Sequence, residues 1–204
     1  MLDGMMRGVI DAPLDSGGRW LARRGASANA VTLAGLALGL LSAGLVAAGW
    51  TGFLVAVLLL ASRLADGLDG AVARARGKSD FGGYLDITCD FAFYGAVPMA
   101  FVILDPAANG AAGAFLLASF YLNGASFLGY AILAAKRGME TTSRGEKSLY
   151  FTAGLLEGTE TILFFLAIVL WPAVFVPAAW VFGALCVVTA TARVMLAART
   201  FRQG

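Results

Sequence analysis

The stretch that decides the fold runs from Asp66 to Asp90 and reads DGLDGAVARARGKSDFGGYLDITCD. Four of its carboxylates, those of Asp66, Asp69, Asp86 and Asp90, stand next to or within strongly apolar flanking segments. Acidic side chains in such segments are costly to bury, and they are usually retained for a bound cation, a partner or a water-filled pocket. The function of the chain therefore depends on what these acids bind.

The composition is that of an integral membrane protein. Of the 204 residues, 59% are hydrophobic and only 14% are charged, which is too apolar for an ordinary soluble domain. The sequence contains no histidine, which excludes an imidazole base and a His-ligated zinc site. The two cysteines, Cys89 and Cys186, lie in different apolar stretches and form no motif. Any metal site must therefore be built from oxygen ligands.

Residues 1–28 and 29–204 differ in character. The first segment mixes apolar residues with Arg and Asp, and it is expected to form an amphipathic helix in the membrane interface, anchored by Trp20, Arg23 and Arg24. The second holds six apolar segments, each near the ~20 residues needed to cross the hydrocarbon layer. We therefore expect an all-α membrane protein, with one interfacial helix and one domain of six transmembrane helices. These six are predicted over residues 30–50, 52–74, 82–104, 110–135, 149–171 and 174–197.

The placement of the basic residues predicts the orientation. If both termini are inside, all 15 Lys and Arg residues fall on or toward the cytoplasmic side, and the three outer turns carry none. Cytoplasmic loops of membrane proteins are enriched in Lys and Arg. The chain is therefore expected in a membrane, with a bacterial inner membrane as the predicted location and with both termini and the active site cytoplasmic.

The spacing of the acids brings them together in a helical hairpin whose inner turn lies near Lys78. Because a helix rises ~1.5 Å per residue, Asp66 and Asp90 lie at nearly equal depth, and Asp69 and Asp86 form a second matched pair. Within each helix the two acids are three or four residues apart and share a face. Carboxylates this close repel one another unless cations neutralise them. An all-oxygen site favours Mg²⁺ or Mn²⁺.

Small residues and one arginine accompany the acids. Gly70 follows Asp69 directly, and Gly82 stands one turn before Asp86, so a substrate has room against the backbone. Arg74, one turn from Gly70 toward the cytoplasm, is suited to gripping a phosphate or a base. Metal ions beside an arginine, just below the headgroups, are what phosphoryl transfer on a lipid-anchored diphosphate needs.

The pattern Asp66-x2-Asp69-Gly70-x2-Ala73-Arg74-x7-Gly82-x3-Asp86-x3-Asp90 resembles the signature of the CDP-alcohol phosphotransferases, also called CDP-alcohol phosphatidyltransferases. All eight positions and their spacings match. The six-helix layout with an amphipathic N-terminal helix also resembles that family, so the likeness covers nearly the whole chain. Residues 27–32, SANAVT, look like the family's entry into the first helix, with alanine where proline is common before the asparagine.

The resemblance implies a two-metal site. Asp66, Asp69 and Asp86 would bind two divalent cations, Mg²⁺ or Mn²⁺, and Asp90 would complete the second position. Asp90 would also be the catalytic base that takes the proton from the acceptor hydroxyl.

The resemblance also implies a nucleotide site. Gly70, Ala73 and Arg74 would receive the cytidine diphosphate moiety together with Asp66, and Gly82 would leave space for it. The acceptor alkoxide would attack one phosphorus in line, and CMP would leave. A homodimer is expected, with the lipid bilayer and no nucleic acid among the partners.

The acceptor pocket is less clearly written in the sequence. Arg144, Lys147 and Arg193 are candidates to clamp an acceptor phosphate, or they face anionic lipid at the inner surface. Glu157 and Glu160 either line the same pocket or pair with basic side chains inside the bundle, since acids within a membrane usually face its interior. The candidate acceptor pocket thus comprises Arg144, Lys147, Glu157 and Arg193.

The family branch that uses inositol phosphate carries arginines beside the two glutamates. Here Gly158 and Thr161 fill those places, so an acceptor phosphate has less to hold it. The sequence therefore leaves the acceptor open among glycerol phosphate, an inositol derivative, serine and other polyols.

The expected activity is transfer of a phosphatidyl group from CDP-diacylglycerol to a small polar alcohol, with release of CMP in phospholipid biosynthesis. Glycerol 3-phosphate is the first guess for the acceptor. In one alternative the lipid is the acceptor instead of the donor, and a CDP-linked head group is transferred to a lipid alcohol such as diacylglycerol. A cation transporter is a further alternative, but it does not explain Gly70, Ala73 and Arg74 at their spacings.

Overall fold

The fold is a bundle of α-helices, described in a computed structural model for residues 2–139 and 158–201 and, over residues 2–9, for the backbone alone. No strand occurs within these residues, so the predicted all-α class is confirmed. The elements are α1 (Leu2–Arg23), α2 (Ala28–Ala47), α3 (Phe53–Arg76), α4 (Asp80–Leu104), α5 (Pro106–Lys136), α7 (Gly158–Leu170), the short 3₁₀ helix η1 (Pro172–Val174) and α8 (Phe175–Phe201).

The hairpin between α3 and α4 follows from three residues at its turn. Gly77 ends α3 with φ of 107°, a backbone conformation that favours glycine because it has no Cβ atom. Ser79 then caps α4, since its hydroxyl oxygen accepts a hydrogen bond from the backbone N–H of Gly82. The chain therefore reverses within residues 77–79, which confirms the predicted turn near Lys78. The cytoplasmic location of this turn stays a prediction.

Helix α2 packs against both helices of this hairpin, and the glycines of α2 allow the helices to approach closely. A Cβ atom on Gly39 would lie 2.5 Å from the Phe93 ring and 2.9 Å from Ser62 Oγ. Gly35 has the same role one turn earlier, where its carbonyl accepts a hydrogen bond from Ser62 Oγ at 2.7 Å. Small residues of this kind let membrane helices approach closely.

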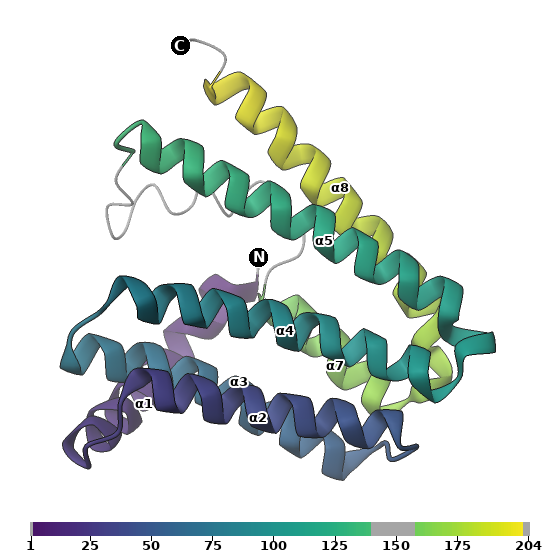
Figure 1. Cartoon of the computed structure of the whole chain (residues 1–204), viewed down its shortest axis with the longest axis horizontal. Coiled ribbons are helices and arrows are strands. Elements are labelled where there is room, and N and C mark those ends of the chain that lie inside the picture. Colours follow the sequence, from purple (N-terminus) through teal and green to yellow (C-terminus); the bar gives the residue numbers. More distant parts are fainter. Residues whose placement is uncertain (1, 140–157, 202–204) are drawn as a thin grey trace.

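Helices α5 and α8 pack along each other and form a second unit of the bundle (Figure 1). The stacked rings of Phe101 on α4 and Phe175 on α8, whose centroids are 4.5 Å apart, join this unit to the hairpin at one end. Asp105 makes the tight link from α4 to α5, because its carboxylate accepts the backbone N–H of Ala108. In Figure 1, α4 and α5 diverge away from this link.

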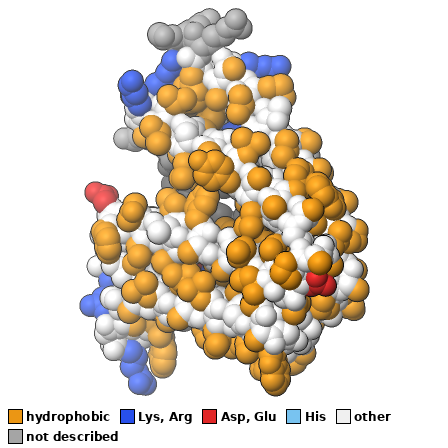
Figure 2. Space-filling model, turned by 45° about the vertical axis from the view of Figure 1, so that its right-hand side comes forward, with side chains coloured by type: hydrophobic (Ala, Val, Ile, Leu, Met, Phe, Trp, Pro, Cys, Tyr) orange, Lys and Arg blue, Asp and Glu red, His pale blue; other side chains and the backbone are white. Residues whose placement is uncertain are grey.

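The exposed surface is apolar over the helices. Large side chains such as Phe53 and Tyr121 are each 80% exposed, and Figure 2 shows hydrophobic atoms over most of one face, with Lys and Arg near its margins. Four described helices, α2, α4, α5 and the stretch from η1 through α8, are long and apolar enough to cross a membrane. Helix α7 is apolar but shorter over its described part, and α3 carries the acids and arginines of the hairpin. A membrane bundle is thus supported, whereas the predicted count of six spans is not confirmed.

Helix α1 covers most of the predicted N-terminal segment and lies against α3. The contact is close at Gly18, where a Cβ atom would lie 2.3 Å from the Cβ atom of Ala71. Trp20 is half exposed and carries the Arg24 guanidinium over its ring, 4.9 Å from the ring centroid. The position of this helix in the membrane interface stays a prediction.

Candidate active site

Three of the four acids form a compact group at the α3–α4 hairpin. One carboxylate oxygen from each of Asp66, Asp69 and Asp86 can be chosen so that all three atoms lie within 4.8 Å of one another. Asp69 is buried and the other two are partly buried. Carboxylate oxygens at this separation suit a hard divalent cation such as Mg²⁺ or Mn²⁺. The residues therefore fit the predicted ion, and their role as ligands stays a prediction.

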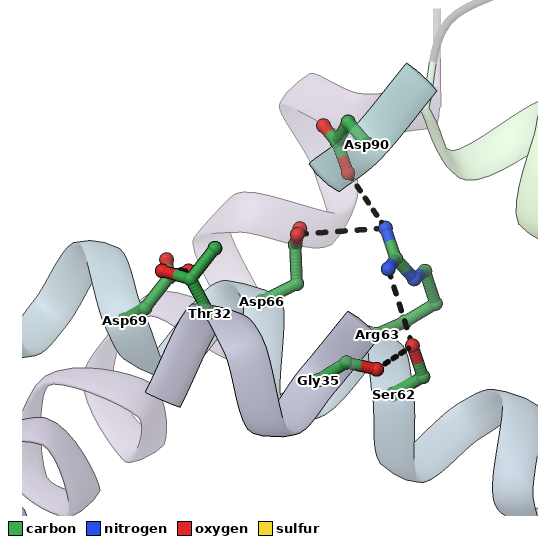
Figure 3. Close-up of polar contacts among 7 residues, drawn as sticks. All are labelled: Thr32, Gly35, Ser62, Arg63, Asp66, Asp69 and Asp90. Carbon is green, nitrogen blue, oxygen red and sulfur yellow. Dashed lines mark hydrogen bonds and ion pairs between the residues drawn. The ribbon is translucent and has the colours of Figure 1, made fainter. Parts of the chain in front are cut away.

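Asp90 lies beside this group and is held by an arginine. The guanidinium of Arg63 on α3 donates from Nη1 to Asp90 Oδ1 at 2.8 Å, and the same nitrogen lies 3.5 Å from Asp66 Oδ1 (Figure 3). Asp66 and Asp90 thus approach each other from different helices, as equal depth in the hairpin predicts. Asp90 is not one of the three residues whose oxygens meet within 4.8 Å.

Asp69 has a partner on α2. The Thr32 hydroxyl donates to Asp69 Oδ2 at 2.5 Å, and both side chains are buried (Figure 3). Thr32 lies one turn into α2, whose first turn is capped by Ser27 through the backbone N–H of Ala30. The hydroxyl of Thr32 therefore fixes one oxygen of the Asp69 carboxylate.

The predicted nucleotide residues lie along the half of the hairpin nearest its turn. A Cβ atom on Gly70 would meet a single neighbour within 4 Å, Arg74 Nη1 at 3.5 Å, so the space over this glycine is otherwise open among the described residues. Ala73 lies between them on α3 and is partly exposed. At Gly82 a Cβ atom would lie 3.3 Å from Asn29 Oδ1, which brings the start of α2 to the same place.

The Arg74 side chain is oriented by helix α1. Its Nε and Nη2 both donate to Asp15 Oδ1, at 3.3 Å and 2.6 Å. Because these two nitrogens are engaged by the carboxylate, Nη1 is the nitrogen left toward Gly70.

A chamber of about 480 Å³ opens beside Asp90, between α4, α5, α7 and α8. Most of its described lining is apolar, with rings from α4 and α5, and its charged members are Asp90 and Arg193. The described lining residues are Ile87, Asp90, Phe91, Tyr94, Gly95, Leu117, Phe120, Tyr121, Asn123, Gly124, Phe127, Gly158, Thr161, Cys186 and Arg193.

Of the predicted acceptor residues, Arg193 lies within the described part of the chain, where it lines the chamber. It is buried, and its Nη1 donates to Asn123 Oδ1 at 2.9 Å and to Ser126 Oγ at 2.7 Å. Its Nε is buried without a hydrogen-bond partner among the described residues. The other predicted acceptor residues, Arg144, Lys147 and Glu157, lie outside the described residues.

Three contacts at this site are not predicted from the sequence: Arg63 with Asp90, Thr32 with Asp69, and Asp15 with Arg74. The contact of Arg63 with the acids is the easiest of the three to predict, because Arg63 precedes Asp66 by three residues and therefore shares its helical face. The other two join residues that are 37 and 59 positions apart. No local pattern marks such pairs.

Comparison with known proteins agrees with this geometry. The CDP-alcohol phosphatidyltransferase family matches residues 26–199. The inner membrane protein YnjF of Escherichia coli (strain K12) is 45% identical over 195 residues, which cover 95% of this chain and 94% of that protein.

A solved structure shares the fold. The crystal structure of Mycobacterium tuberculosis phosphatidylinositol phosphate synthase (PgsA1) with CDP-DAG bound aligns with a TM-score of 0.67 at 25% identity, covering 89% of this chain and 92% of that one. The family match over most of the chain, the long alignment to YnjF and the carboxylate hairpin lead to the same conclusion. The chain is a membrane enzyme that belongs to the CDP-alcohol phosphatidyltransferase family.

Proposed function

We propose that the protein transfers a phosphatidyl group from CDP-diacylglycerol to a small polar alcohol and releases CMP. The observation that carries this proposal is the cluster of three carboxylates, from Asp66, Asp69 and Asp86, which lies beside Asp90 and next to the open backbone at Gly70. Support for the donor comes from the structural likeness to a synthase that was crystallised with CDP-DAG.

The carboxylate group is proposed to hold the divalent ions, Mg²⁺ or Mn²⁺. Asp66, Asp69 and Asp86 would hold the ions, and Asp90 would complete the second position. When bound, such ions neutralise the charge of a diphosphate and stabilise the charge that develops in phosphoryl transfer.

The remaining steps are assigned to side chains of the chain itself. Gly70, Ala73 and Gly82 leave the hairpin surface open to the cytidine diphosphate, and Arg74 binds its phosphate oxygens with a planar donor group. Asp90 accepts the proton of the acceptor hydroxyl. The oxygen of that hydroxyl then forms a bond to the lipid-linked phosphorus, the bond from this phosphorus to the CMP oxygen breaks, and CMP leaves as the anion.

The acceptor is proposed to enter through the chamber beside Asp90. This chamber is the described cavity that contains both the proposed base and a buried cation, Arg193. A buried guanidinium whose Nε has no hydrogen-bond partner among the described residues suits an anionic acceptor. Glycerol 3-phosphate is therefore the first acceptor to test, and the pocket is proposed to include Arg144, Lys147 and Glu157 as well.

The test is an acceptor screen with purified protein. Labelled CDP-diacylglycerol and Mg²⁺ are supplied with glycerol 3-phosphate, inositol phosphates, serine and other polyols, and CMP release and lipid product are followed. We expect release only with an acceptor and a divalent ion. Asp66→Ala and Asp86→Ala should abolish it, whereas Asp80→Asn, in the same hairpin but outside the carboxylate group, should not. Release that persists in EDTA would contradict the metal role.

A second candidate is transfer of a CDP-linked head group to a lipid alcohol. The apolar part of the chamber lining, with Phe91, Phe120 and Phe127, is the observation that favours it. The same assay separates the two, because this candidate requires a soluble CDP-alcohol and diacylglycerol and gives no CMP from CDP-diacylglycerol with a water-soluble acceptor.

We also propose that both termini and the carboxylate hairpin face the cytoplasm of a bacterial inner membrane, and that the protein is a homodimer. The orientation is supported by the distribution of Lys and Arg. The likeness to an E. coli inner membrane protein supports the location. Reporter fusions at the C-terminus test the orientation, and the mass of the purified protein in detergent tests the dimer.

A further inference from the structure

Arg63 is a cation placed where charge is expensive. It lies on α3 within the bundle, and its side chain is only 7% exposed. A buried guanidinium is costly unless it is paired and hydrogen-bonded. Its carboxylate contacts, to Asp90 at 2.8 Å and to Asp66 at 3.5 Å, belong to the acids of the proposed active site. The position therefore calls for an explanation in terms of those acids.

The Arg63 guanidinium is held by a hydrogen bond at its edge and by an aromatic ring against its face. Its Nη2 lies 3.2 Å from Ser62 Oγ, which is itself bonded to the backbone of Gly35. Its central carbon lies 3.8 Å from the centroid of the Phe93 ring, a cation–π distance. Phe93 is in turn held by the close approach of Gly39. Arg63 is thus a rigid donor rather than a mobile surface charge.

This rigid donor determines where Asp90 lies. Asp90, which is held through Oδ1, is also a wall residue of the 480 Å³ chamber. In contrast, Asp66, Asp69 and Asp86 come within 4.8 Å of one another. Since Asp90 and Asp66 both contact Nη1, the cation also relieves the repulsion between them.

We propose that Arg63 is a positioning residue of the transferase: it holds Asp90 at the chamber wall, beside Asp66, Asp69 and Asp86, and so fixes the side chain that would take the proton of the acceptor hydroxyl. The proposal rests on the proposed role of Asp90 as the base. Arg63 itself touches neither the acceptor nor the phosphorus. It acts through Asp90, and any effect of its removal on turnover must pass through that side chain.

The experiment compares Arg63→Gln and Arg63→Lys in the wild-type and Asp90→Asn backgrounds, with Arg76→Gln as an exposed control. Arg63→Gln should lower kcat by about 10- to 100-fold, part of the usual contribution of a general base. The KM for CDP-diacylglycerol should stay within about two-fold. Arg63→Lys should recover part of kcat, because an ammonium can pair with Asp90 but lacks the second arm to Ser62. In the Asp90→Asn background the Gln substitution should have no further effect.

Mn²⁺ binding, followed by electron paramagnetic resonance without substrate, provides a readout independent of turnover. Removing a cation from beside the carboxylates should make Mn²⁺ bind several-fold more tightly in Arg63→Gln, whereas damage to the fold would weaken it. The proposal is overturned by unchanged or weaker Mn²⁺ binding, by unchanged kcat, or by an equal loss of kcat in the Asp90→Asn background. If the wild type releases no CMP with any acceptor, the transferase proposal fails, and the Mn²⁺ result still reports whether Arg63 is the partner of these acids.

Discussion

Asp15 on the N-terminal helix α1 holds Arg74 on α3 through two donors, Nη2 at 2.6 Å and Nε at 3.3 Å, both to the same carboxylate oxygen. The helix predicted to lie in the membrane interface is therefore joined directly to a residue of the proposed nucleotide site. The pair also fixes which guanidinium nitrogen remains toward Gly70. If Arg74 binds the donor as proposed, this contact gives α1 a part in substrate binding.

Loss of the Asp15 carboxylate should weaken donor binding. In Asp15→Asn the Arg74 guanidinium loses its fixed orientation. We therefore expect the KM for CDP-diacylglycerol to rise about three- to ten-fold with little change in kcat, which is the pattern of a lost binding interaction. Asp15→Glu should lie between the mutant and the wild type. The measurement is steady-state CMP release at varied donor concentration. A lower KM in Asp15→Asn would show instead that the carboxylate competes with the substrate for Arg74.

The same pair predicts a dependence of stability on pH. The hydrogen bond from Arg74, followed by its positive charge, holds the pKa of Asp15 below its ordinary value of 3.8. The folded protein thus binds this proton less tightly than the unfolded chain, so the contribution of the pair is complete above pH 3.8 and is lost as the pH falls through the lowered pKa. The difference in thermal midpoint between wild type and Asp15→Asn should stay constant from pH 8 to about 5 and shrink only in stronger acid. A difference that already vanishes near neutral pH would contradict the assignment.

Thr32 should matter for metal affinity. Thr32→Val removes the hydroxyl that bonds Asp69 Oδ2 while it keeps the shape of the side chain. Groups that orient a metal ligand typically contribute about 10- to 100-fold in affinity, so we expect Mn²⁺ binding to weaken by at least about 10-fold. Thr32→Ser retains the hydroxyl and is the matched control. Equal Mn²⁺ affinity in the Val and Ser variants would remove Thr32 from the site.

Gly39 should be intolerant of a methyl group. A Cβ atom there would lie 2.5 Å from the Phe93 ring and 2.9 Å from Ser62 Oγ, so Gly39→Ala must separate α2 from the hairpin. Overpacking of this kind costs about 1–3 kcal/mol of folding free energy. Gly44→Ala, on the same helix with no atom within 4 Å of the added carbon, is the control. Thermal unfolding in detergent should show a lower midpoint for the first variant only.

The sequence was sufficient to predict the carboxylate hairpin. The acids, the glycines and the turn are separated by fixed numbers of residues within two adjacent helices, and helical geometry converts such spacing into position. The meeting of Asp66 with Asp69 and Asp86 follows from that spacing once Gly77 and Ser79 form the turn.

Contacts between distant elements could not be predicted in this way. The partner of Asp69 comes from α2 and the partner of Arg74 comes from α1, and neither Thr32 nor Asp15 carries a mark of its role in its own neighbourhood. The sequence shows the charge of Arg63 but not its burial, so the distribution of Lys and Arg alone places it with the basic residues of the cytoplasmic side. Burial depends on Gly39 and Phe93, which lie on two other helices.

The separation of α5 and α8 from the hairpin has a consequence for how such an enzyme diversifies. The acids stand on α3 and α4, whereas α5, α7 and α8 supply the far wall of the chamber. If the acceptor alcohol enters this chamber as proposed, changes in α5, α7 and α8 alter which alcohol is admitted and leave the acids of α3 and α4 unchanged. Replacing α5 and α8 with those of a relative that uses a different acceptor is then expected to change the lipid product.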